Sequence, residues 1–380
     1  MTVTVHHGDS REVLKSFPDA SIDSVVCDPP YALVSIGKRF GAENAAAAKP
    51  GKTGAYARAS AGFMGQKWDT GETAFDPDFW VEVLRVLKPG GHLLAFSGTR
   101  TYHRLACAVE DAGFEIRDMI AWLYGSGFPK SHNVGKKTER AEDMGWGTAL
   151  KPAIEPIVLA RKPLAGTVAV NVLAHGTGAL NIDASRIAGE KTPAPVGQFR
   201  GSDVGATGLR GVRDGSADNL GRWPANVIHD GSNEVIAAFP DTASGTGAVK
   251  KASADGYQGN ALGKESRPAG TAMISHGDAG SAARFFYSAK ADAADRCGSK
   301  HPTVKPIDLM AYLCRLVTPK GGTVLDPFAG SGSTGMACLR EGFDCVLIER
   351  EAQYVEDIHR RLKHVEGADT PLFAQPDGLF

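Results

Sequence analysis

Short apolar runs alternate with amphipathic stretches along most of the chain. Compact apolar runs bounded by turn residues predict strands, and apolar residues three or four positions apart predict helices. The predicted strands are 3–5, 22–27, 92–97, 115–123, 154–160, 323–325 and 345–348. The predicted helices are 10–17, 79–87, 101–112, 307–317, 334–340 and 352–363. Ser10 is the expected cap of the first helix, and Pro89 to Gly91 are expected to separate helix 79–87 from the next strand. This alternation is typical of an α/β domain with a largely parallel sheet.

The middle of the chain has a different character. Residues 166–280 hold 20 of the 46 glycines, and their apolar runs are short and scattered. Because the α/β pattern flanks this segment on both sides, we expect one sheet domain assembled from both chain ends around an inserted region. The expected parts are a catalytic half at 1–165, the loop-rich insertion at 166–280, a second half at 281–365 and a tail at 366–380.

Composition narrows the class of protein. The 42 Lys and Arg residues nearly balance 43 Asp and Glu residues, so net charge predicts no global attraction to nucleic acid or a membrane. No apolar run approaches the roughly 18 residues of a membrane span, and no signal core opens the chain. Six cysteines without a C-x-x-C pair predict free thiols and no metal site. We therefore expect a cytoplasmic protein without membrane association.

A glycine-rich loop follows the strand predicted at 323–325. Gly330, Gly332 and Gly335 fit the G-x-G-x-x-G spacing, in which residues without a Cβ let a cofactor approach the strand end. Glu349 ends the next predicted strand, 19 residues after Gly330, where a carboxylate can accept hydrogen bonds from ribose hydroxyls. No lysine follows the glycines, which disfavours an NTPase. The pattern predicts a nucleoside-bearing cofactor.

Asp326 separates two cofactors of that kind. A carboxylate at the strand end faces a cationic amino group favourably but repels a pyrophosphate. S-adenosylmethionine carries an ammonium and a sulfonium, whereas NAD carries two phosphates. Asp326 therefore favours the methyl donor, with an NAD-dependent oxidoreductase as a less favoured alternative.

The tetrad Asp28-Pro29-Pro30-Tyr31 follows the strand at 22–27, at the carboxyl edge where open α/β sheets bind ligands. An exocyclic amine of adenine or cytosine is a poor nucleophile because its lone pair is delocalised into the ring. Two acceptors for its N–H groups favour a more tetrahedral nitrogen; Asp28 supplies a carboxylate and the rigid proline pair presents a carbonyl. Tyr31 supplies a flat face for stacking the base.

These motifs resemble those of the amino-group DNA methyltransferases, which carry D/N/S-P-P-Y/F/W and F-x-G-x-G. The second motif is here Phe328-Ala329-Gly330-Ser331-Gly332. A tetrad that precedes a long variable segment and then the cofactor loop is similar to the permuted β group of that family. The resemblance covers roughly 1–165 and 281–365, and it implies a Rossmann-like S-adenosylmethionine-dependent fold with target recognition in the insertion.

The resemblance also implies roles for single residues. Asp326 is expected near the methionine ammonium of the cofactor, Glu349 on its ribose and Asp9 near its adenine amino group. Residues 301–306 match a family element in which Thr303 and Lys305 are expected to line the methionine pocket. Ser288 and Phe286 are weaker candidates. The complete expected cofactor set is Asp9, Thr303, Lys305, Asp326, Phe328, Ala329, Gly330, Ser331, Gly332, Ser333 and Glu349.

Double-stranded DNA is the expected partner, and the target base must leave the duplex, so positive charge is expected near the tetrad. Residues 36–67 carry six basic side chains and one acid, and we expect them to form a mobile loop that closes over DNA. The insertion has ten basic and eleven acidic residues, so base reading there would depend on a few arginines. The expected DNA contacts are Lys38, Arg39, Lys52, Arg58, Lys67, Arg200, Arg210 and Arg213. A second basic cluster consists of Lys130, Lys136, Lys137 and Arg140.

Asp28, rather than serine, at the first position of the tetrad favours N6 of adenine as the target. Methylation of cytosine N4 is the first alternative, and a non-catalytic DNA-binding protein is another. Direct transfer requires no covalent intermediate, so Cys27 is not expected to act as a nucleophile. A homodimer and a cognate restriction enzyme are partners that the family makes possible.

Overall fold

The computed structural model describes residues 1–31, 73–128, 131–188, 221–243, 279–289, 293–299, 301 and 303–366. The chain divides into two compact units. The first unit comprises residues 1–185, 226–232 and 288–380, and the second comprises 186–225 and 233–287. Residues 168–175 and 227–229, which lie inside the predicted insertion, belong to the first unit.

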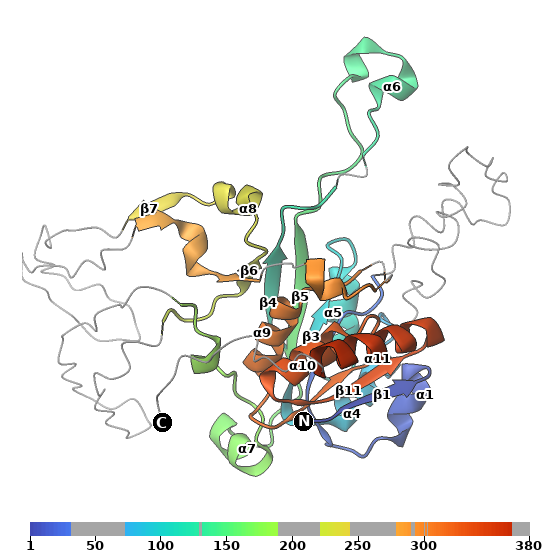
Figure 1. Cartoon of the computed structure of the whole chain (residues 1–380), viewed down its shortest axis with the longest axis vertical. Coiled ribbons are helices and arrows are strands. Elements are labelled where there is room, and N and C mark those ends of the chain that lie inside the picture. The colour runs from blue at the N-terminus through green and yellow to red at the C-terminus, as the bar shows by residue number, and fades with distance from the viewer. Residues whose placement is uncertain are drawn as a thin grey trace, which may run out of the picture. The chain divides into compact units, whose positions relative to one another are not determined.

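A nine-stranded sheet is built from both ends of the chain, in the order β1-β11-β10-β2-β3-β5-β4-β6-β9 (Figure 1). Its strands are β1 Val3–His7, β2 Ile22–Cys27, β3 Leu87–Phe96, β4 Glu115–Leu123, β5 Ile154–Arg161, β6 Val227–His229, β9 Tyr287–Ser288, β10 Thr323–Asp326 and β11 Asp344–Glu349. The neighbours from β1 to β3 are parallel, whereas β5 is antiparallel to both β3 and β4. The predicted α/β domain with a largely parallel sheet from both chain ends is confirmed.

Different helices cover the two faces of this sheet (Figure 1). The helices of the first unit are α1 Ser10–Val13, α4 Pro77–Val86, α5 Tyr102–Asp111, α6 Gly135–Thr138, α7 Val168–His175, α9 Ile307–Val317, α10 Ser333–Glu341 and α11 Ala352–Glu366. Val25 of β2 and Leu93 of β3 share a buried cluster with Trp80 of α4. On the other face α10 packs closely on β11, since a Cβ at Gly335 would lie 2.7 Å from Leu347 Cδ1.

Two local expectations were wrong. The first helix is capped by Asp9, whose carboxylate accepts the Arg11 backbone N–H, because the Ser10 hydroxyl donates instead to the carbonyl of Pro327. Strand β3 also begins at Leu87 and runs through Pro89 to Gly91. That stretch forms a bulge in the strand, with Gly90 at a φ of +77° and a shift of register against β2, and the Lys162 amide donates to the Gly91 oxygen at 2.9 Å.

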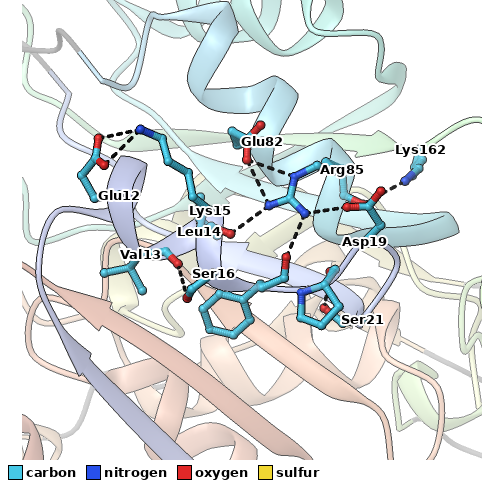
Figure 2. Close-up of polar contacts among 12 residues, drawn as sticks. Glu12, Val13, Leu14, Lys15, Ser16, Asp19, Ser21, Glu82, Arg85 and Lys162 are labelled. Atoms are coloured by element: carbon cyan, nitrogen blue, oxygen red, sulfur yellow. Dashed lines mark hydrogen bonds and ion pairs between the residues drawn. The ribbon is translucent and has the colours of Figure 1, made fainter.

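Arg85 of α4 braces the segment that follows β1 (Figure 2). Its guanidinium donates to the carbonyl oxygens of Leu14 at 2.9 Å and Phe17 at 2.8 Å. It also pairs with Asp19 at 2.6 Å and with Glu82, one helical turn earlier, at 3.0 Å. This one side chain therefore fixes the connection between the first two strands against α4.

The second unit is described only in part. It contains α8 Asn233–Ala238 and an antiparallel pair formed by β7 Asp241–Ala243 and β8 Ala279–Ser281. The guanidinium of Arg284 lies 4.3 Å from the ring centroid of Phe285. Among the helices of the described ranges, none is both long and apolar enough to cross a bilayer.

Candidate active site

The sheet brings five acidic side chains to one edge. Asp9 follows β1, Glu349 ends β11, Asp326 ends β10 and Asp28 follows β2. These strands are parallel neighbours, so their carboxyl ends meet at the same edge. Strand β5 runs the other way, and its second residue, Glu155, therefore lies at this edge too. The edge is thus divided between a glycine-loop side at β11 and β10 and a tetrad side at β2, β3 and β5.

On the tetrad side, the ammonium of Lys305 connects two carboxylates. Lys305 Nζ lies 2.9 Å from Asp28 Oδ2 and 2.9 Å from Glu155 Oε2. The Tyr31 hydroxyl accepts a hydrogen bond from Lys305 Nζ at 2.9 Å and donates one to Glu155 Oε2 at 2.9 Å. The ring of Phe96, at the end of β3, lies beneath the ammonium with its centroid 4.7 Å from Nζ. We call Asp28, Tyr31, Glu155 and Lys305 the tetrad cluster.

Lys305 is buried, the other members of the tetrad cluster are partly buried, and together they control one another's charge. Burial alone would lower the pKa of Lys305, but the carboxylates of Asp28 and Glu155 outweigh burial and raise that pKa above its ordinary value. Burial, together with the same two carboxylates, raises the pKa of Tyr31 well above its ordinary value. Lys305 therefore carries a proton, and Tyr31 keeps its own, throughout the neutral range.

One acceptor of the tetrad cluster remains free. Asp28 Oδ1 is buried and has no hydrogen-bond partner among the described residues, while Oδ2 accepts from Lys305. A buried carboxylate oxygen without a donor costs free energy, about 1–3 kcal/mol or more. Asp28 therefore presents an acceptor that a ligand N–H group would satisfy.

On the glycine-loop side, Glu349 holds the turn between β10 and α10. Its Oε2 accepts the Gly330 amide at 2.8 Å, and its Oε1 accepts the Glu351 amide at 2.7 Å. Gly330 and Gly332 have φ values of +51° and +77°, a region that costs other L-residues about 1–2 kcal/mol. The loop therefore needs glycine at these positions to bring its backbone back to the sheet edge.

Asp326 lies beneath this loop. Its Oδ1 accepts the Phe328 amide at 3.0 Å and its Oδ2 accepts the Thr334 hydroxyl at 2.5 Å. Burial raises the pKa of Asp326 to about 7, although both hydrogen bonds oppose the shift. The carboxyl group can therefore gain or lose a proton near neutral pH.

Arg361 supports the loop from α11. Its guanidinium donates to the carbonyl oxygens of Ser331 and Asp295 and reaches the Ser333 hydroxyl at 3.3 Å. Arg361 is fully buried, and burial lowers its pKa. The start of α10 is thus tied to the last helix of the first unit.

The structure groups some of the predicted residues and separates others. Lys305, expected in the methionine pocket, contacts Asp28 in the tetrad cluster, and Thr303 is exposed. Asp9 caps α1 and forms an ion pair with Arg11 at 2.8 Å. The residues predicted from Phe328 to Ser333 form the loop and the start of α10. Outside the described residues lie Lys38, Arg39, Lys52, Arg58, Lys67, Arg200, Arg210 and Arg213.

Two residues of the site escaped the sequence reasoning. Glu155 is an acid at the start of an apolar run, where a functional side chain could have been suspected once the strand was placed at the carboxyl edge. Arg361 stands three residues after Ile358, on the apolar face of the last helix, and a basic residue on that face needs buried partners. Neither lies in a motif.

No cluster of three or more His, Cys, Asp or Glu side chains that could hold a metal ion occurs within the described part of the chain.

Comparison with protein families covers both the tetrad side and the glycine-loop side of the edge. A family model for the N6/N4 DNA methylases matches residues 22–360, which includes both the tetrad and the glycine loop. The chain belongs to this family of DNA methylases.

Individual relatives match shorter segments of the chain than the family model does. The Type II methyltransferase M.HindIII of Haemophilus influenzae is 26% identical over 200 residues, which cover 47% of this chain and 64% of the relative. The Type II methyltransferase M2.DpnII of Streptococcus pneumoniae is 36% identical over 69 residues, 18% of this chain and 26% of the relative. The chain therefore spans less than two thirds of the length of either relative.

Solved structures also match the methylase chain. The complex of M1.HpyAVI with S-adenosylmethionine has a TM-score of 0.42 at 15% identity, over 95% of this chain and 99% of that chain. The cytosine-N4-specific PvuII DNA methyltransferase has a TM-score of 0.44 at 15% identity, over 97% of this chain and 91% of that chain.

Proposed function

We propose that this protein transfers a methyl group from S-adenosylmethionine to an exocyclic amine of double-stranded DNA, with N6 of adenine as the target. The observation that carries the proposal is the free, buried Oδ1 of Asp28. Asp28 directly follows β2, and β2 is the direct neighbour of β10, which leads into the glycine loop. An acceptor for an N–H group therefore stands next to a loop suited to a nucleoside.

The chemistry of the glycine-loop side fits S-adenosylmethionine. Glu349, Asp9 and Asp326 are three acids at the ends of three adjacent strands. Acids suit a ligand that offers ribose hydroxyls, an amino group and positive charge, and they disfavour the pyrophosphate of NAD. When bound, this cofactor supplies a methyl group activated on a sulfonium. In this assignment Glu349 binds the ribose, Asp9 lies near the adenine and Asp326 near the methionine ammonium.

The tetrad supplies the acceptors that a flipped-out amine needs. Asp28 Oδ1 accepts one N–H of the amine, and a carbonyl of the Pro29-Pro30 pair accepts the other, which favours a more tetrahedral nitrogen. Tyr31 lies against the backbone of Gly98 and offers its ring to the base. The nucleophile is the base itself. Cys27 has no part in transfer, because burial raises the pKa of its thiol well above the ordinary value.

The connection between β4 and β5 supports binding of DNA (Figure 1). Phe128 and Trp146 in this connection are 80% and 69% exposed, and Lys136 and Lys137 are exposed on α6. Exposed aromatic rings beside ammonium groups suit the bases and phosphates of nucleic acid. The connection starts and ends at the carboxyl edge, beside the tetrad cluster. We assign it to DNA contact, together with the basic residues predicted at 36–67 and in the insertion.

The decisive experiment identifies the methylated nucleoside. The protein is incubated with S-adenosylmethionine labelled in its methyl group and with DNA of mixed sequence, and the DNA is digested to nucleosides. Label in N6-methyladenine supports the proposal in full, and label in N4-methylcytosine changes the target base. Absence of transfer by a protein that binds both DNA and cofactor would refute it.

Asp28→Asn is the matched variant for this assay. The amide keeps the shape, and its oxygen still accepts a hydrogen bond from Lys305, but it loses the charge and one acceptor. We expect transfer to fall by roughly 10²–10³-fold, as when one oriented polar group is lost from an active site, with cofactor affinity within about twofold. Equal loss of both would place Asp28 in the cofactor pocket instead.

A further inference from the structure

Glu155 is the one member of the tetrad cluster that belongs neither to the two motifs nor to the family element at 301–306. It lies on the antiparallel strand β5, opposite Trp122 of β4, and its side chain is 20% exposed. Its Oε2 receives both the Tyr31 hydroxyl and the Lys305 ammonium, each at 2.9 Å. A carboxylate that holds two members of a candidate active site has a role that the acceptor chemistry of Asp28 alone does not explain.

We propose that Glu155 is a positioning residue for methyl transfer, acting through Lys305 on Asp28. Glu155 holds the ammonium so that it covers Asp28 Oδ2 and leaves Oδ1 open to the target amine. This inference rests on the proposed function, since it assigns a purpose to the free oxygen of Asp28.

The hydrogen-bond valence of the ammonium supports this role. A lysine ammonium has three N–H donors. Lys305 Nζ has three oxygen partners, Asp28 Oδ2, Glu155 Oε2 and the Tyr31 hydroxyl, each at 2.9 Å. With all three donors engaged, no N–H of Lys305 remains for Asp28 Oδ1. Removal of the Glu155 acceptor releases one donor, and Oδ1, on the same carboxylate as Oδ2, is a buried acceptor without a partner among the described residues.

The charge of the tetrad cluster points the same way. Two carboxylates and one ammonium give the cluster one net negative charge. The target nitrogen gains positive charge as its new bond to the methyl carbon forms, before a proton leaves it. A cluster with net negative charge stabilises that nitrogen, whereas a single Asp28–Lys305 pair would be neutral.

The variants Glu155→Leu and Glu155→Gln separate position from charge. Leucine removes the acceptor, and glutamine keeps an oxygen for Lys305 and Tyr31 while removing the charge. The matched control is Glu115→Leu on β4, whose carboxylate pairs with Arg161 at 2.6 Å at the opposite edge of the same sheet. Each variant is assayed for single-turnover methyl transfer at saturating DNA and cofactor, for cofactor and DNA affinity, and for thermal unfolding.

We expect Glu155→Leu to transfer roughly 10- to 100-fold more slowly than the wild type, and Glu155→Gln to recover part of the loss. In Glu155→Leu, the affinities for S-adenosylmethionine and for DNA should stay within about twofold of the wild type. In Glu115→Leu, the transfer rate and both affinities should stay within about twofold of the wild type. In a Lys305→Met background, Glu155→Leu should cause little further loss of rate, because Glu155 acts through the ammonium.

The outcomes separate this inference from the proposed function. If the wild type fails to methylate DNA, the proposed function is wrong. If the wild type transfers and Glu155→Leu is within about threefold of it, Glu155 has no positioning role. A rate loss that is matched by lower cofactor affinity and a lower unfolding temperature would show that Glu155 serves stability alone. A rate loss that is undiminished in the Lys305→Met background would show that Glu155 does not act through the ammonium.

Discussion

Replacing Arg361 with methionine should destabilise the glycine loop, because the loop loses the side chain that supports it from α11. The guanidinium donates to the buried carbonyl of Ser331 and to that of Asp295, and no solvent reaches its side chain. A hydrogen bond from a charged donor contributes about 1.5–3 kcal/mol, so the two contribute about 3–6 kcal/mol. Methionine offsets part of this loss, because a buried guanidinium whose Nε lacks a partner among the described residues is itself costly. We expect unfolding free energy to fall by about 3 kcal/mol.

Urea unfolding of the first unit, followed with and without S-adenosylmethionine, measures this change. The Arg361→Met variant should also bind the cofactor at least about tenfold more weakly, because the Ser331 carbonyl and the start of α10 lose their common anchor. Tenfold corresponds to about 1.4 kcal/mol of binding free energy.

Arg360→Met provides the matched control. Arg360 precedes Arg361 on α11 but is 53% exposed and pairs only with Asp357 one turn away among the contacts of the described residues. Such exposed pairs contribute about 0–1 kcal/mol, so this variant should be nearly neutral in both assays. Equal effects of the two substitutions, or no effect of Arg361→Met on stability and cofactor affinity, would contradict the assigned role.

Three further predictions concern other parts of the first unit. Arg85→Met should lower the free energy of unfolding by about 2–3 kcal/mol in urea, because the carbonyls of Leu14 and Phe17 lose a charged donor while cofactor affinity is kept. Folded Asp326 holds its proton up to about pH 7 against 3.8 unfolded, so its contribution to stability should fall as pH rises from about 4 to 7 and level off above. The difference in unfolding free energy between the wild type and Asp326→Asn should therefore change over this range and stay constant above it. Cys27→Ala should keep the single-turnover transfer rate within about threefold of the wild type, because burial keeps the thiol protonated. Loss of labelled product in this variant would instead indicate a covalent intermediate on Cys27.

The sequence predicts the fold well where local pattern decides. The limits of α9 and β4 agree with the structure at both ends. Strand β3 begins earlier than predicted, because Pro89 and the two glycines after it resemble a turn, whereas the strand continues through them as a bulge whose Gly91 oxygen accepts the Lys162 amide. Such pairing depends on a strand 70 residues later and leaves no local signal.

The same distinction holds for the site. The contact of Glu349 with Gly330 was foreseeable, because strand, loop and helix follow one another within 19 residues. Lys305 instead meets Glu155 across 150 residues and Tyr31 across 274. These contacts follow from the order of strands in the sheet, which no motif contains. The contacts of Lys305 with the tetrad were therefore not foreseen, and Glu155 was overlooked.

The position of β10 inside the sheet also determines when the tetrad cluster can assemble during synthesis of the chain. Strand β10 pairs with β2 on one side, and the Thr323 amide donates to Asp23 across 300 residues. At about 5–20 residues per second, a ribosome needs roughly 15–60 s to make that stretch. Through that interval β2 lacks its neighbour and Asp28 lacks Lys305. A nascent chain therefore has no assembled tetrad cluster, and one that terminates early exposes an unpaired strand edge, which makes it a target for chaperones and proteases instead of a partial enzyme.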